Sequence, residues 1–226
     1  MAISSRMRPA YYPAMLDLAG RDALLVGGGE VAAQKARPLL EAGVRLRIVA
    51  PTLTDALRAR VDAGDASWEE REVRPGDVAG AAVVVCATDV RATNRRVFEE
   101  ASAAGIPVNV VDDPELCSFI VPSVVRRGPL QVAISTGGRS PAFAKFMRLR
   151  LEEAIGEEYG ALAELAGRMR DRAREAGVGY EARDRIAADA LPRLLDLLRA
   201  GRAAEAQALA DELAQGSARV EEAGTP

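Results

Sequence analysis

Residues 23–32 read Ala-Leu-Leu-Val-Gly-Gly-Gly-Glu-Val-Ala, and this stretch decides the fold of the chain. An apolar run that suits a buried strand leads into three glycines and then a helix-like segment, which matches the pattern G-x-G-x-x-A. Gly27 permits a tight turn, Gly29 lets a backbone approach a pyrophosphate, and Ala32 lets the helix pack closely on the strand. The amino end of that helix offers free N–H groups and partial positive charge to phosphates. A glycine-rich turn without a ligand is the alternative, but the strand–turn–helix context favours dinucleotide binding.

The same alternation of short apolar runs and helix-like segments continues as far as residue 113. It is typical of βαβ units on a parallel sheet. We therefore predict the α/β class, with a Rossmann-type doubly wound parallel sheet of about five strands. The strands are expected at 23–26, 46–50, 68–73, 82–87 and 107–111, and the helices at 30–42, 53–63 and 90–104.

After Pro114 the pattern changes to a small β segment and then to helices. Strands are expected at 118–126 and 130–134, around the turn 127–129, and two strands alone need another surface to pair with. Ser140 and Pro141 begin a helix, and the rest of the chain is rich in Ala, Leu, Glu and Arg, which predicts a small helical domain. Three parts are therefore expected, at residues 1–113, 114–150 and 151–226.

The composition excludes several classes of site. The 226 residues include no histidine, which removes His-ligated metal sites, serine–histidine hydrolases and cysteine–histidine nucleophile pairs. Cys86 and Cys117 form no metal-binding pattern, so no metal site is expected, and Cys86 is most simply a core residue. The apolar stretches fall short of the roughly 20 residues that cross a bilayer, and the first 18 residues lack the apolar core of a signal peptide. The expected location is the cytoplasm.

The net charge of −3 conceals a segregation of charge along the sequence. Residues 1–113 carry a net charge of −2 and residues 151–226 carry −6, whereas residues 114–150 carry +5. A central stretch that positive in an acidic protein suggests an anionic partner. A solvated basic face is the alternative.

The expected dinucleotide site lacks one common element. The second strand ends at 48–52 without the Asp or Glu that would hold the hydroxyls of the adenosine ribose, so Thr52 and backbone groups would have to serve. Arg45 and Arg47 begin that strand and are poorly placed for a 2′-phosphate, so this local chemistry leaves NAD and NADP open. Thr88, in the turn after the fourth strand, is expected beside the cofactor, with a plain helix cap as an equal alternative.

Two acids, Asp112 and Asp113, follow the last strand of the predicted sheet. Ligands of open α/β sheets bind at the carboxyl ends of the strands, so a carboxylate there can face a substrate. Because the chain has no histidine, Asp112 is the best candidate for a general base. Asp113 precedes a proline and suits a turn, and a polar turn is the alternative for both acids.

These motifs together resemble a known family. Their order is that of the precorrin-2 dehydrogenase and sirohydrochlorin ferrochelatase family, and the chain is similar to the dehydrogenase/chelatase part of siroheme synthase. The resemblance covers roughly residues 11–155, and beyond about Gly160 only a helical domain is shared. Besides the glycine loop, the motifs that carry it lie at 12–18, 35–37, 49–51, 87–89, Asn94, 109–112, 118–123 and 135–141.

The resemblance implies NAD-dependent oxidation of precorrin-2 to sirohydrochlorin, on the way to siroheme or a corrinoid. It implies a homodimer in which residues 114–150 form the dimerisation segment. It assigns the catalytic role to Asp112, and four further residues fall on positions that contact NAD in the family: Glu30, Val31, Pro51 and Thr52. Thr136 stands where relatives often have serine, which keeps a hydroxyl at a substrate-binding position.

The family's substrate carries eight carboxylates, which suits the positive segment. We expect four basic residues to hold these groups by charged hydrogen bonds: Arg126, Arg127, Arg139 and Lys145. Family members differ in whether they also insert Fe²⁺, so a ferrochelatase activity that uses Fe²⁺ or Co²⁺ as a substrate is an alternative. A non-catalytic NAD(H)-sensing module is a remote one. The acidic helical tail has no basic recognition helix, so neither nucleic acid nor a membrane is an expected partner.

Overall fold

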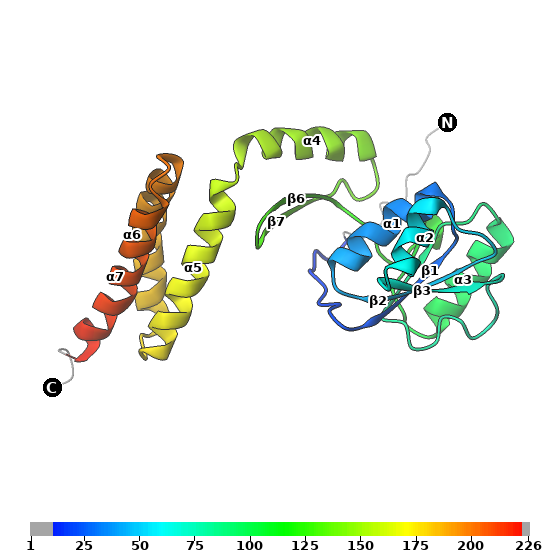
Figure 1. Ribbon diagram of the computed structural model, residues 1–226, viewed down its shortest axis with the longest axis horizontal. Coiled ribbons are helices and arrows are strands. Elements are labelled where there is room, and N and C mark those ends of the chain that lie inside the picture. The colour runs from blue at the N-terminus through cyan, green and yellow to red at the C-terminus, as the bar shows by residue number, and fades with distance from the viewer. Residues whose placement is uncertain (1–10, 223–226) are drawn as a thin grey trace, which may run out of the picture. The chain divides into compact units, whose positions relative to one another are not determined.

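The protein is described by a computed structural model that covers residues 11–222, with side chains described as far as residue 213 (Figure 1). Residues 1–10, which held most of the segment considered for a signal peptide, lie outside the described part. The chain divides into two compact units, one ending at Val121 and the other beginning at Pro122. The division into 1–113, 114–150 and 151–226 stays a prediction.

The first unit is built on a five-stranded sheet of order β3-β2-β1-β4-β5, in which every neighbouring pair is parallel. This confirms the predicted α/β fold of the Rossmann type. Its elements are β1 (Asp22–Val26), α1 (Glu30–Glu41), β2 (Arg45–Ala50), α2 (Asp55–Asp62), β3 (Ala66–Glu70), β4 (Val83–Cys86), α3 (Arg91–Ala103), β5 (Val108–Val110) and the 3₁₀ turn η1 (Pro114–Leu116).

Alternating side chains of the central strands build a hydrophobic core on each face of the sheet. Leu24 of β1 packs in a cluster with Val97 of α3, on one face. Leu25, the next residue of β1, packs in a second cluster with Ala36 of α1 and Leu57 of α2, on the other face. Such apolar strands, covered on both sides, are what a parallel sheet requires.

The segment after β5 differs from the prediction. A strand was expected from residue 118, but β6 begins only at Ser123. Residues 117–119 instead lie antiparallel to β5, where Ser118 Oγ accepts a hydrogen bond from Val108 N at 2.8 Å and Asn109 Nδ2 donates to Phe119 O at 3.0 Å. Each of these bonds joins a side chain on one side to a backbone group on the other, so backbone groups at the edge of the sheet are paired without a regular ladder of backbone hydrogen bonds.

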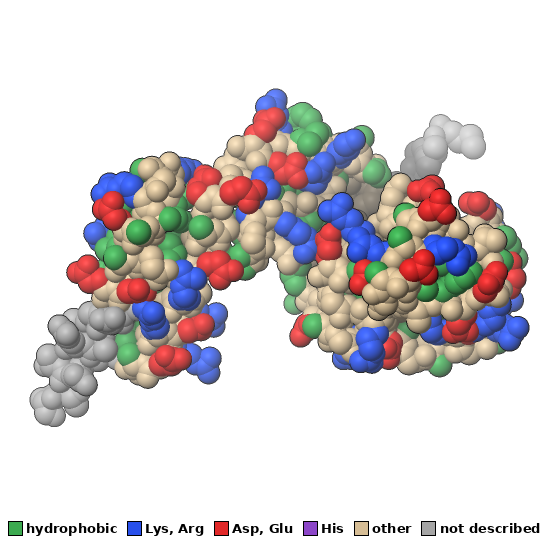
Figure 2. Space-filling view, in the orientation of Figure 1, with side chains coloured by type: hydrophobic (Ala, Val, Ile, Leu, Met, Phe, Trp, Pro, Cys, Tyr) green, Lys and Arg blue, Asp and Glu red, His purple; other side chains and the backbone are tan. Residues whose placement is uncertain are grey.

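The second unit begins with an antiparallel hairpin and continues into helices. Ser140 Oγ accepts a hydrogen bond from Phe143 N at 3.2 Å, so serine caps the next helix as predicted. Hydrophobic and basic side chains lie together over α4 (Figure 2), and Phe143 and Phe146 are each about half exposed there. No helix within residues 11–222 is both long and apolar enough to cross a membrane. The elements are β6 (Ser123–Arg127), β7 (Leu130–Ile134), α4 (Pro141–Ala154), α5 (Glu158–Glu175), α6 (Tyr180–Arg199) and α7 (Ala203–Glu222).

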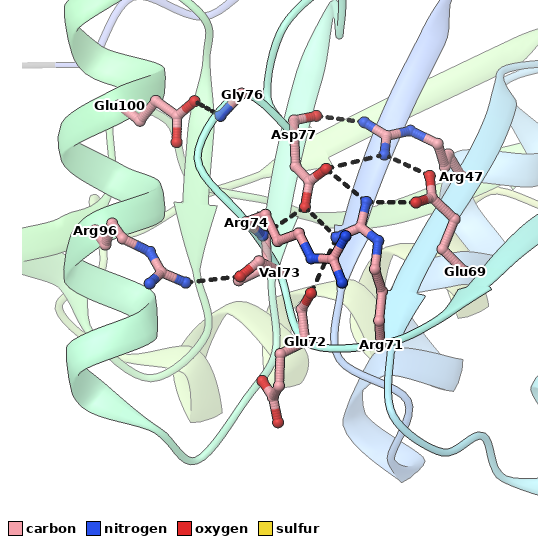
Figure 3. A network of polar contacts seen from close by, with 10 residues as sticks. All are labelled: Arg47, Glu69, Arg71, Glu72, Val73, Arg74, Gly76, Asp77, Arg96 and Glu100. Carbon is pink, nitrogen blue, oxygen red and sulfur yellow. Dashed lines mark hydrogen bonds and ion pairs between the residues drawn. The ribbon is translucent and has the colours of Figure 1, made fainter.

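A network of ion pairs fixes the loop that follows β3 (Figure 3). The Arg71 guanidinium donates to both carboxylate oxygens of Asp77 at 2.8 Å, and Arg74 N donates to the same carboxylate at 2.7 Å. Arg47 Nη1 lies 2.9 Å from Glu69 Oε1 and 3.7 Å from Asp77 Oδ1, so Arg47 joins this network at the sheet. The hydrogen bonds from Arg71 lower the pKa of Asp77 to about 2, although partial burial acts in the opposite direction.

Replacing Asp77 with asparagine is expected to lower the free energy of unfolding at pH 7 by about 2 kcal/mol, because the pKa of Asp77 in the folded state lies below its unfolded value. A lowered pKa stabilises the folded state above the unfolded pKa, and this contribution is lost as the pH falls from about 4 toward 2. Urea unfolding at pH 7, 5 and 3 should therefore show the difference between D77N and the wild-type protein shrinking with acid. The control is D65N, since Asp65 is an exposed partner of Arg60. A difference that stays constant with pH would contradict the prediction.

Candidate functional site

A cleft of about 360 Å³ lies at the carboxyl ends of β1, β2 and β4 in the first unit. Its lining includes the glycine loop 27–29, residues 49–54 from the end of β2 onward, and residues 87–90 after β4. Val26 of β1, residues 72–73 of the loop after β3 and Thr93 of α3 complete it. The strand order reverses between β1 and β4, and this is the point at which doubly wound sheets bind their ligands.

The three glycines of the loop have different surroundings. A Cβ on Gly27, which has φ of 119°, would lie 2.3 Å from Ala87 O, and one on Gly28 would lie 1.8 Å from Thr52 O. A Cβ on Gly29 would have nothing within 4 Å. Gly27 and Gly28 therefore let the loop pass closely between the ends of β4 and β2. Gly29 leaves open space beside the backbone.

The start of α1 fits the pyrophosphate of a dinucleotide. Gly29 is the residue before the first turn of α1, and no side chain caps that turn within the described part of the protein. The first N–H groups of the helix are thus available to an anion. Thr54, which also lines the cleft, has a buried Oγ1 atom without a hydrogen-bond partner among the described residues.

The predicted cofactor residues fall into two groups. Five of these residues line the cleft. The other two, Glu30 and Val31, lie on the exposed first turn of α1 and outside that lining. Gly28, Leu53, Glu72 and Thr93 also line the cleft and were not predicted. The glycine pattern leaves the position of Gly28 free, and no sequence signal marks Glu72. The predicted residues that line the cleft are Gly27, Gly29, Pro51, Thr52 and Thr88.

The hydroxyl of Thr88 is engaged by the fold. It donates to Asn94 Oδ1 at 2.8 Å and accepts from Val90 N at 3.2 Å, while Asn94 Nδ2 donates to Thr88 O at 2.9 Å. Asn94 is buried, and the Cys86 thiol donates to the same Asn94 oxygen at 3.0 Å. Burial raises the pKa of Cys86 to about 12, so Cys86 is a protonated core residue at neutral pH. Thr88 thus shapes the entry to α3 and presents its methyl group toward the glycine loop.

Asp112 lies at the same edge of the sheet as the cleft. The ladder pairs Cys86 of β4 with Val110 of β5, and Val111 N donates to Cys86 O at 2.9 Å, so both strands end at this edge. Asp112 is exposed and, within residues 11–222, is the single non-glycine residue with a positive φ, at 59°. Aspartate is among the few residues that tolerate this left-handed conformation.

The turn around Asp112 is held by its neighbours. Cys117 Sγ lies 3.2 Å from Val110 O and 3.3 Å from Asp113 O, on either side of Asp112 along the chain. Asp113 Oδ2 lies 3.9 Å from Arg91 Nε, so the second acid faces a cation. These contacts distinguish the two acids, and Asp112 remains the candidate base.

The predicted substrate residues belong to the second unit. Arg127 Nε donates to Ile155 O at 2.8 Å and Arg127 Nη2 donates to Glu152 O at 3.0 Å, at the carboxyl end of α4. These bonds favour a structural role for Arg127. Thr136 Oγ1 accepts from Ser140 N at 2.9 Å and closes the turn before α4. The exposed basic candidates are Arg126, Arg139 and Lys145.

Metal ligands do not gather anywhere within the described part of the chain: no three His, Cys, Asp or Glu residues there could hold an ion together.

Trp68 of β3 does not line the cleft itself but is hydrogen-bonded to a residue that does. Its Nε1 donates to Ala50 O at 3.0 Å, and Ala50 lines the cleft.

Replacing Gly29 with alanine is expected to weaken the binding of NAD by about tenfold or more, because the methyl group would fill the space beside the helix start. The folded protein has room for that methyl group, so the melting temperature should change little. Isothermal titration with NAD and thermal unfolding measure the two quantities. The control is G167A on α5, where a Cβ also meets nothing within 4 Å. Unchanged affinity in G29A would exclude the loop from the binding site.

The strand order, the glycine loop and the uncapped helix start define the first unit as a dinucleotide-binding domain. Residues 14–123 match the family model described as "Putative NAD(P)-binding". Residues 127–154 match the model described as "Sirohaem biosynthesis protein central". The two matches follow one another along the chain.

Curated relatives and a solved structure agree with these matches. The siroheme synthase of Pseudomonas paraeruginosa (strain DSM 24068 / PA7) is 45% identical over 204 residues, which are 89% of this chain and 44% of that protein. The siroheme synthase of Pseudomonas aeruginosa (strain UCBPP-PA14) is 45% identical over 213 residues, 93% of this chain and 46% of that protein. The structure of SirC, precorrin-2 dehydrogenase, is 25% identical with a TM-score of 0.70, covering 89% of this chain and all of that chain.

These matches confirm the resemblance to the precorrin-2 dehydrogenase and sirohydrochlorin ferrochelatase family that the motifs of the chain predicted. The chain spans less than half the length of the two siroheme synthases.

Proposed function

We propose that this protein oxidises precorrin-2 to sirohydrochlorin with NAD as hydride acceptor, in the biosynthesis of siroheme or of a corrinoid. The observation that carries the proposal is the dinucleotide cleft at the carboxyl ends of β1, β2 and β4, with an exposed carboxylate, Asp112, at the same edge of the sheet. The similarity to a structure named precorrin-2 dehydrogenase and to siroheme synthases supports it.

The cleft and Asp112, which lies at the same edge of the sheet, would carry out different parts of this reaction. NAD, when bound, supplies the acceptor for the hydride. The amino end of α1 holds the pyrophosphate with backbone N–H groups, and Gly29 leaves room for it. Asp112 takes up the proton that leaves the macrocycle, because its carboxylate is exposed and carries no ion pair among the described residues.

The carboxylates of precorrin-2 would be held by basic side chains of the second unit. Arg126, Arg139 and Lys145 are exposed and belong to the stretch of net charge +5. Arginine suits this role because its guanidinium pairs with a carboxylate through two hydrogen bonds. Arg127 and Thr136 would act by holding this part of the chain in shape.

We propose that the protein acts as a homodimer in the cytoplasm. The hairpin of β6 and β7 has two open edges within the described residues, and a two-stranded sheet is marginal alone. Phe143, Phe146 and Leu149 are each about half exposed on α4. A second copy of the chain would cover both features. Sedimentation equilibrium tests the dimer.

An anaerobic assay with the purified protein, NAD and precorrin-2 tests the proposed reaction. Formation of NADH and sirohydrochlorin in equal amounts supports it. A protein that binds NAD and leaves the tetrapyrrole unchanged would be a sensor of NAD, which is the remote alternative.

Iron insertion is the second candidate activity, because the relatives are named siroheme synthases and Asp112 could accept the pyrrole protons that a metal displaces. The same preparation, supplied with sirohydrochlorin and either Fe²⁺ or Co²⁺, tests it. Metal-dependent loss of sirohydrochlorin above the rate without protein would establish chelation. The metal is a substrate in this scheme.

A further inference from the structure

The cleft has an unusual distribution of charge for a dinucleotide site. In domains of this kind an Asp or Glu at the end of the second strand commonly holds the 2′-hydroxyl of the adenosine ribose. Here β2 ends at Ala50 and is followed by Pro51 and Thr52. Among the described residues, the charged ones that line the cleft are Glu72 and Asp89, with no lysine or arginine.

Glu72 lies on the side of the cleft where the missing acid would be. The ladder between β2 and β3 pairs Ala50 with Glu70, the last residues of the two strands. Thr52 and Glu72 each follow two residues later, and both line the cleft. Asp89 follows β4, on the other side of β1 in the sheet. Of the two acids, Glu72 is therefore the one beside the end of β2.

The backbone at Glu72 is held in place by arginines. Arg71 Nη1 donates to Glu72 O at 2.9 Å, and Arg96 Nη2 of α3 donates to Val73 O at 2.8 Å. The Arg71 guanidinium is itself fixed by the buried carboxylate of Asp77. This part of the loop is consequently positioned before any ligand binds, as a precise binding site requires.

The carboxylate of Glu72 is not used by this network. It points away from the guanidinium groups of Arg47 and Arg71 (Figure 3) and forms no ion pair within the part of the chain that the structure describes. It is exposed, and the described residues that line the cleft beside it include no lysine or arginine. A free carboxylate on a fixed backbone is a suitable acceptor for two neighbouring hydroxyl groups.

We propose that Glu72 holds the ribose hydroxyls of the adenosine half of NAD and thereby excludes NADP. The 2′-phosphate of NADP carries a charge of about −1.5 to −2, by analogy with other phosphate monoesters. It would meet a carboxylate, and no lysine or arginine of the described lining would offset the repulsion. The inference rests on the dinucleotide binding in the proposed function, but not on the oxidation of a tetrapyrrole. Glu72 thus replaces, from the loop after β3, the acid that β2 lacks.

The test is the equilibrium binding of three nucleotides, NAD, NADP and NAD with a 2′-deoxyadenosine half, measured by titration calorimetry without tetrapyrrole. E72Q is expected to weaken NAD binding by about tenfold, because a charged hydrogen bond becomes a neutral one. The deoxy analogue should bind about tenfold more weakly than NAD to the wild-type protein, and this difference between the two ligands should be clearly smaller in E72Q, where only a neutral hydrogen bond to the 2′-hydroxyl is left to lose. E72K should bind NADP more tightly than NAD.

Two variants serve as controls. E70Q removes a carboxylate two residues away that does not line the cleft, and it should leave all three affinities unchanged. D89N removes the other acid of the cleft and should preserve the preference for NAD. The proposal is overturned if E72Q and E72K keep the wild-type ratio of NADP to NAD affinity, or if D89N changes that ratio instead.

The titrations test the role of Glu72 in nucleotide binding, and the enzymatic assay tests the oxidation of precorrin-2, so either hypothesis can be disproved while the other stands. A protein with an NAD preference that depends on Glu72, but with no oxidation of precorrin-2, would disprove the proposed reaction and leave the role of Glu72 intact. A protein that binds neither nucleotide would overturn both.

Discussion

Replacing Asp112 with asparagine is expected to slow the oxidation of precorrin-2 by about 10²- to 10⁴-fold, the range that a general base contributes. Asparagine has the size of aspartate and also tolerates a φ of 59°, so the turn should persist. The lost function is the uptake of a proton by the carboxylate. The affinity for NAD should remain within about twofold of the wild-type value, because Asp112 does not line the dinucleotide cleft.

Single-turnover formation of NADH measures the chemical step, and titration calorimetry measures NAD binding. The matched control is D113N, in which the neighbouring acid is replaced. Asp113 faces Arg91 and begins the turn into η1, so D113N should retain most of the activity. An unaltered rate in D112N, or an equal loss in D113N, would remove the catalytic assignment from Asp112.

Replacing Gly28 with alanine is expected to destabilise the first unit by about 3 kcal/mol, the upper part of the range for overpacked sites. The added Cβ would lie 1.8 Å from Thr52 O, so the backbone of one segment must move. The movement would also disturb the hydrogen bond from Thr54 N to Gly28 O, which is 2.8 Å long. The loop and the start of α2 would lose their mutual support.

Urea unfolding followed by circular dichroism measures this loss of stability. The comparison with G29A is direct, because the two positions are adjacent and an added Cβ meets backbone at one and open space at the other. G28A should unfold at a lower urea concentration, whereas G29A should unfold near the wild-type midpoint. Equal midpoints for the two variants would show that the close approach at Gly28 is relieved without cost.

The fold of the first unit could be predicted because its signals are local. The apolar runs of β1 and β4 match the buried strands that a parallel sheet needs, and the glycine loop between β1 and α1 has a conformational requirement that few other residues meet. The Ser140 cap of α4 was readable for the same reason, since the capping side chain lies three residues from the group it binds.

Features that depend on distant segments were missed. Arg47 was predicted only to begin the second strand, and its ion-pair network was not foreseen, because its partners Glu69 and Asp77 lie 22 and 30 residues further along the chain. The place of Glu72 in the cleft follows from the register of β2 and β3, which the sequence does not state. The strand expected at 118–126 was wrong in its first half because the Ser118 hydroxyl bonds a backbone group of β5 and the Asn109 amide of β5 bonds a backbone group of the following segment.

The position of Trp68 makes the fluorescence of the protein sensitive to its cofactor. It is the chain's single tryptophan, and it is tied through its indole N–H to Ala50 in the wall of the cleft. NADH absorbs light at the wavelengths where tryptophan emits, whereas NAD does not. Energy transfer from the indole to a reduced nicotinamide would therefore quench the emission of the protein as the cofactor is reduced. The intrinsic fluorescence of the protein can report the redox state of its own site without an added label.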